Sequence, residues 1–161
     1  MKTFKDNAGR VWTIAINVAT LKRVKGLIKV DLLEVLEGKL IERLMADPVL
    51  LVDVVYAVCK PEADAAGVTD EQFGQAMAGD AIELATTALL EELIDFFPSR
   101  RDRERAKKVL AMAWNMVDKA QNLMDAKLDS PETQRMLEEA LESIGGSSGS
   151  SPASPQSTPT P

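Results

Sequence analysis

The spacing of apolar residues changes near residue 17. Before that point Trp12, Ile14 and Ile16 alternate with residues of the opposite face, which is the period of a β-strand. The preceding segment, residues 6–9, is rich in residues that tolerate a positive φ and predicts the turn of a hairpin. After residue 17 apolar residues recur three and four apart, as in helices. We therefore expect a mainly α fold with a small N-terminal β-hairpin, an α+β arrangement.

Start and stop signals divide the helical part of the chain. A helix beginning at residue 18 is expected to end at Gly26, because glycine favours the C-terminal end of a helix. Asp47 followed by Pro48 is an N-cap with proline at the first helical position, and it predicts an aliphatic helix that Pro61 ends. Between these two helices Gly38 interrupts an apolar pattern, so a break there is expected.

Further signals mark the helices that follow. Thr69 and Gln72 have the spacing of a capping box, in which each side chain binds the backbone of the other. Pro98 is expected to stop a long helix rich in Leu and Glu. Ser130 and Pro131 predict the start of a last helix, which ends near residue 144.

Composition changes twice after Pro98. Six cations lie from Arg100 to Lys108. From Gly145 onward the chain holds mainly Gly, Ser, Pro and Thr and no charged residue. Such a tail cannot build a core, so we expect it to be disordered. The predicted organisation is a compact domain over 1–98, a helical extension over 99–144, and a disordered tail over 145–161.

Charge and reactive groups narrow the classes of function. The net charge is −6, whereas phosphate contacts require a basic face, so nucleic acid is not an expected partner. The longest apolar run is too short to span a membrane. One cysteine, Cys59, fits a reducing compartment, and we interpret it as a small buried hydrophobe rather than a reactive thiol.

The chain offers few groups for catalysis. It has no histidine, which removes the commonest general base and metal ligand, and no phosphate-binding glycine pattern occurs. We therefore expect no catalytic residue, no metal site and no cofactor, and interpret the protein as a binding protein rather than an enzyme. The basic run of residues 100–108 fits either a solvated face or a contact with an acidic partner.

The order of these signals resembles a known family. The hairpin, the Asp47-Pro48 helix, the start Thr69-Asp70-Glu71-x-Phe73, and a Leu/Glu helix ending in Phe96-Phe97-Pro98 together look like the tail assembly chaperones of long-tailed bacteriophages. These small proteins are encoded ahead of the tape measure protein. The resemblance covers residues 1–98, and some family members are also made as a longer frameshifted product.

The resemblance implies a function and partners. Such a chaperone binds the tape measure protein in the host cytoplasm, keeps it soluble until tail-tube protein replaces it, and is absent from the mature virion. Alternatives are a structural tail or head–tail completion protein, and a small acidic adaptor that binds a host protein. Candidate groove residues lie on the aliphatic helices, although aliphatic residues at helical spacing usually pack in the core: Leu50, Val54, Leu89 and Leu93.

Two features of the basic helix bear on interfaces. Trp114 is either an interface anchor or a packed aromatic residue. Apolar residues at alternating spacings of four and three form a seam typical of self-association between helices, which predicts a homo-oligomer. The seam residues are Ala106, Leu110, Ala113, Val117, Ala120 and Met124.

Overall fold

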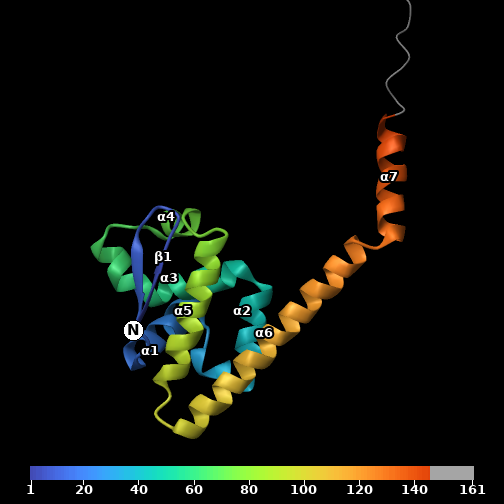
Figure 1. The fold of residues 1–161 in the computed structure, drawn as a ribbon. Helices are drawn as coiled ribbons and strands as arrows, with labels where there is room; N and C mark the ends of the chain where they lie inside the picture. Colours follow the sequence, from blue (N-terminus) through green and yellow to red (C-terminus); the bar gives the residue numbers. More distant parts are fainter. Residues whose placement is uncertain (146–161) are drawn as a thin grey trace, which may run out of the picture. The chain divides into compact units, whose positions relative to one another are not determined.

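The computed structural model describes residues 1–145 and begins with the predicted hairpin (Figure 1). Strands β1 (Lys2–Lys5) and β2 (Val11–Ile14) pair antiparallel, with Phe4 opposite Trp12. Phe4, Trp12 and Ile14 point to one face and are buried there. Alternation of side chains in a strand puts these residues on one side, so the hairpin has an apolar face that packs on helices.

The rest of the described chain is helical, so the expected mainly α fold with an N-terminal hairpin is confirmed. The helical elements follow one another with short connections. They are α1 (Val18–Ile28), the 3₁₀ helix η1 (Leu32–Glu37), α2 (Lys39–Ala46), α3 (Pro48–Ala65), α4 (Asp70–Gln75), α5 (Asp80–Phe96), α6 (Arg100–Leu128) and α7 (Pro131–Gly145). Within residues 1–145 none of these helices is long and apolar enough to cross a membrane.

The predicted helix starts are confirmed in atomic detail. The Asp47 carboxylate accepts hydrogen bonds from the backbone N–H groups of Val49 and Leu50, each 3.0 Å long. Thr69 and Gln72 form the reciprocal capping box. The break at Gly38 also occurs, because this residue adopts φ +82° between η1 and α2.

Two predicted helix ends are wrong. Helix α1 continues through Gly26 and ends at Ile28, with Lys29 as its C-cap. Glycine inside a helix costs only about 1 kcal/mol, which packing against α3 offsets. Helix α3 continues through Pro61 to Ala65. Proline lacks the N–H that would bind the carbonyl of Ala57, and the Arg23 guanidinium of α1 supplies a donor to that oxygen at 2.8 Å instead.

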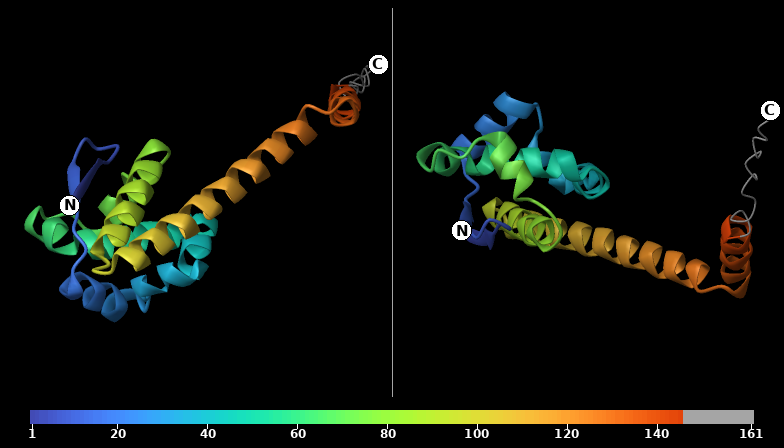
Figure 2. Two further views of the ribbon diagram at one scale, coloured as in Figure 1. Left: turned by 60° about the horizontal axis from the view of Figure 1, so that its bottom comes forward. Right: turned by 90° about the horizontal axis from the view of Figure 1, so that it is seen from above.

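The core lies where the hairpin and the helices meet. The first strand packs along α5, the second packs against α3, and α3 also contacts α1, α2 and α5. Figure 2 shows α1 to α3 on one side of this body, with α5 and the start of α6 on the other. Trp12, Tyr56 and Phe73 form an aromatic group, with ring centroids 5.0 Å apart for Trp12 and Phe73 and 5.3 Å apart for Tyr56 and Phe73.

Residues Met1–Met116 form one compact unit, and a second unit begins at Val117. The first turns of α6 belong to the first unit, where the Ala106 side chain is fully buried. The predicted division after residue 98 stays a prediction. The predicted disordered tail lies outside the described residues, except for Gly145, which ends α7.

Candidate binding site

Most of the residues predicted to line a groove lie in the core instead. Val54 of α3 and Leu89 and Leu93 of α5 have no exposed surface. Leu50 is partly buried and packs against the same core. The reason is that α3 is surrounded by α1, α2, α5 and β2, so almost every apolar position on it meets a neighbour. These four residues stabilise the fold and do not form an open groove.

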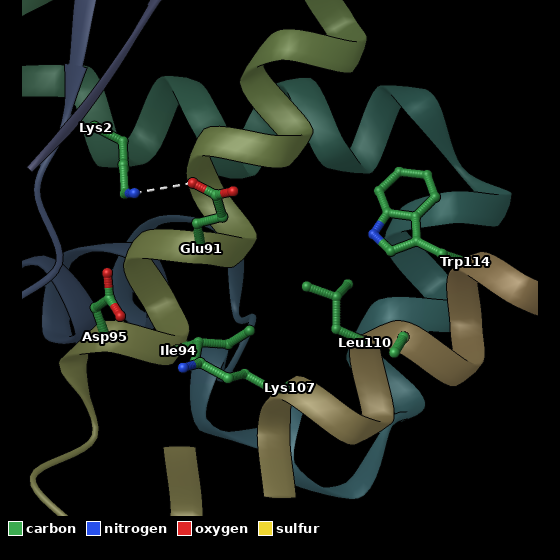
Figure 3. Close-up of a pocket in the computed structure, with 8 residues that line it drawn as sticks. Lys2, Glu91, Ile94, Asp95, Lys107, Leu110 and Trp114 are labelled. Carbon is green, nitrogen blue, oxygen red and sulfur yellow. Dashed lines mark ion pairs between the residues drawn. The ribbon is translucent and has the colours of Figure 1, made fainter. Parts of the chain in front are cut away.

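A groove does occur beside Trp114, between α5 and α6 (Figure 3). Its volume is about 420 Å³, enough for a few aliphatic side chains of a partner but not for a whole helix. Trp114 is partly exposed at one side of the groove. The lining residues are Lys2, Glu91, Ile94, Asp95, Lys107, Leu110, Ala111 and Trp114.

Charged residues surround the apolar part of this groove. Lys2 Nζ of β1 lies 3.0 Å from Glu91 Oε2 of α5, as Figure 3 shows. The hydrogen bond from Lys2 to the Glu91 carboxylate, and then its negative charge, raise the pKa of Lys2. Because Lys2 and Glu91 pair with each other, the apolar surface that the groove offers a partner comes mainly from Leu110 and Trp114, since Ile94 is only 4% exposed.

The predicted self-association seam on α6 is divided between two environments. Ala106 is buried, and Leu110 and Ala113 pack partly buried against the body, so these residues face their own core. Val117 is half-buried and Met124 is 65% exposed. The first half of the seam is therefore used within the chain, and only the second half is open to a partner.

Sequence reasoning missed further exposed apolar residues on the last two helices. Between residues 117 and 143 no side chain is buried, although both helices have an apolar face. Methionine, whose flexible side chain adapts to varied partners, is frequent among these exposed apolar residues. This frequency is the sequence feature that could have indicated an exposed binding surface. Besides Met124 of the predicted seam, the exposed residues are Met112, Met116, Leu123, Leu128, Met136, Leu137 and Leu141.

The thiol of Cys59 is poorly suited to chemistry. It lies in α3 with 1% of its surface exposed. Burial, and secondarily the charge of Glu62, raises the pKa of this thiol to about 12. Because the thiolate is the nucleophilic form, this side chain stays protonated and unreactive near neutral pH.

Part of the basic run also has a local role. Arg103 donates hydrogen bonds to the carbonyl oxygens of Phe97 and Pro98, at 2.6 and 3.0 Å. These carbonyls follow the end of α5, where backbone oxygens have no N–H donor from the helix itself. Arg103 thereby holds the connection between α5 and α6, which positions the groove. Arg100, Arg101 and Arg105 are exposed.

Taken together, the described residues offer an apolar groove beside Trp114 and a longer exposed apolar surface on α6 and α7. Both are suited to holding another polypeptide segment, since apolar patches of this kind mark interaction sites. Comparison of the chain with protein-family models, curated protein sequences and solved structures returned no match.

Proposed function

We propose that this protein is a tail assembly chaperone of a long-tailed bacteriophage. In this proposal it binds the tape measure protein in the host cytoplasm and keeps it soluble until tail-tube protein takes its place. The order of hairpin, capped helices and stop signals in residues 1–98 supports the proposal through its resemblance to that family.

One structural observation carries the proposal. The helices α6 and α7 expose a run of Met and Leu side chains over residues 112–141, outside the buried core. Exposed apolar surface on this scale costs free energy in water unless a partner covers it. A long helical protein that aggregates alone would bury its own apolar face there. The net charge of −6 helps such a complex stay soluble.

The test is co-expression with the tape measure protein encoded nearby, followed by a solubility assay and a pull-down. We expect the tape measure protein to become soluble and to co-purify. Met124→Asp with Leu128→Asp should abolish this effect, because two charges enter the apolar surface. The matched control is Asn115→Asp with Asn122→Asp, which adds the same charge to the opposite side of α6 and should leave binding intact.

Three results would contradict the proposal. They are a tape measure protein that stays insoluble, equal loss of binding in both variants, and recovery of the chain from purified virions. The last result would instead indicate a structural component of the particle.

A further inference from the structure

Two consecutive helices each present an apolar row that no described residue covers. On α6 the row consists of Val117, Ala120, Met124 and Leu128 in the second unit, at spacings of three and four. On α7 it consists of Met136, Leu137, Ala140 and Leu141. Helices of about this length are marginal in water when alone, so most of their stability must come from packing of the apolar face.

The connection between these helices has the length of a helical hairpin turn. Only Asp129 and Ser130 separate them. The Thr133 N–H donates to Ser130 Oγ at 3.3 Å, and Thr133 Oγ1 donates to the carbonyl of Lys127 at 2.8 Å. Antiparallel helices are commonly joined by about two to five residues. The turn is therefore short enough to bring α7 back along α6.

The two apolar rows match in register. Each helix rises about 1.5 Å per residue, so residues equally far from the turn lie opposite each other in an antiparallel hairpin. To within one residue, Met124 then lies opposite Met136, Ala120 opposite Ala140, and Val117 opposite Leu141. The small pair in the middle permits close approach of the two backbones, and the larger pairs lie on either side of it.

One pair of charges beside the rows matches as well. Lys127 flanks the α6 row, and in the antiparallel arrangement it lies opposite Glu132, which is one turn before Met136 on α7. A lysine then meets a carboxylate at the edge of the apolar contact, next to the turn.

From these matches we propose that α7 folds back onto the second half of α6 as an antiparallel helical hairpin. In this state each helix covers the apolar row of the other before a partner arrives. A partner helix that needs the α6 row then has to displace α7, a step that rests on the proposed function. The hairpin itself does not depend on that function.

Disulfide trapping in the full chain tests the hairpin without any partner. Val117→Cys with Leu141→Cys places two thiols at opposed positions, within the separation that a disulfide requires. The matched control pairs Val117→Cys with Glu142→Cys, one residue further along and on the far side of α7. Cys59 is buried and does not compete.

We expect the first pair to form a disulfide within the monomer at least about tenfold faster than the control pair, because docking raises the effective concentration of the two thiols. Equal rates, no disulfide in either variant, or disulfide-linked dimers would each overturn the hairpin. Dimers would show that a second copy covers the row.

Hydrogen exchange of the unmodified chain gives an independent readout. Amides of α7 should be protected, and Met124→Asp should speed their exchange at least about tenfold, because it removes the packing that holds the helix. Exchange of α7 at the rate of an open chain would overturn the proposal.

The same disulfide tests the displacement step. The oxidised Val117→Cys, Leu141→Cys chain should lose the tape measure protein in the pull-down and recover it on reduction. Equal capture by both forms would overturn displacement while leaving the hairpin and the chaperone proposal standing.

Discussion

At the scale of single residues, Arg23 shows how a side chain from one helix allows proline inside another. Its Nε and Nη2 donate to the carbonyl oxygens of Ala57 and Val58, both at 2.8 Å. Without this residue the Ala57 oxygen that Pro61 leaves unpaired would lie against apolar neighbours. A buried carbonyl oxygen without a hydrogen-bond donor lowers the stability of the folded state. Arg23 therefore stabilises the fold.

We expect Arg23→Ala to lower the free energy of unfolding by about 1–3 kcal/mol, measured by urea denaturation. Lys22→Ala is the control, because Lys22 is exposed on the same helix, and should change it by less than about 0.5 kcal/mol. In a Pro61→Ala background, Arg23→Ala should lower the free energy of unfolding by less, because the N–H of Ala at position 61 can then donate to the Ala57 carbonyl. An equal loss of stability in both backgrounds would contradict this account.

Asp6 gives a prediction about pH. Its side chain is fully buried and accepts hydrogen bonds from the Trp12 indole at 2.9 Å and from Arg10 Nε at 2.7 Å. Burial alone raises the pKa of this carboxyl, but the hydrogen bonds from Trp12 and Arg10, with the charge of Arg10, outweigh burial and lower the pKa below 3.8. A lowered folded-state pKa stabilises the protein above the unfolded-state pKa, and this stabilisation is lost as pH falls through the folded-state pKa.

Asp6→Asn should therefore lower the free energy of unfolding by about 1.5–3 kcal/mol at neutral pH, with the deficit shrinking below about pH 4. Urea unfolding followed by far-UV circular dichroism across that range measures both effects. Asp118→Asn, at an exposed position of α6, should show neither effect. A deficit that persists unchanged in acid would show that the contribution of Asp6 does not come from its charge.

At the scale of elements, two glycines that were both expected to interrupt a helical pattern have opposite roles. Gly26 lies inside α1, with nothing near the position of an added Cβ. Gly38 adopts φ +82°, and a Cβ there would lie 3.3 Å from Val109 Cγ1 of α6. The first therefore only weakens a helix, whereas the second permits both the turn into α2 and the approach of α6.

Alanine at these two positions should change stability in opposite directions. Gly26→Ala should raise the free energy of unfolding by about 0.5–1 kcal/mol, and Gly38→Ala should lower it by about 1–3 kcal/mol. Thermal and urea unfolding of both variants provide the comparison, each serving as the control for the other. A neutral Gly38→Ala would show that the contact with α6 adjusts without cost.

At the scale of the whole molecule, the core and the exposed apolar surface are in different parts of the chain. The buried residues end at Ala106, and none lies between residues 117 and 143. Folding of the first unit should therefore not need the second. The second unit would contribute to partner binding instead.

A chain ending at Met116 should keep its free energy of unfolding within about 0.5 kcal/mol of the full chain, because no core residue is removed. In the co-expression assay it should no longer solubilise the tape measure protein. Strong destabilisation would show that residues 117–145 support the body. Full retention of binding would place the binding site within residues 1–116 and contradict the proposed surface.

The sequence by itself determined the hairpin, most helix starts and the mainly α class. These depend on interactions within about four residues, such as the Asp47 cap and the Thr69 capping box, so they can be read without knowledge of the rest of the chain. The same local reasoning misplaced the end of α3, because the donor that makes Pro61 tolerable comes from Arg23 on another helix.

Only the tertiary structure decided which apolar faces are core and which are open. Val54, Leu89 and Leu93 have the same spacing as Met124 and Leu128, and helical periodicity alone cannot separate the two groups. The first three residues are buried because α3 and α5 are enclosed by other elements, whereas Met124 and Leu128 belong to a second unit in which no side chain between residues 117 and 143 is buried. Burial depends on what lies opposite a face, and that is a property of the folded chain rather than of the pattern.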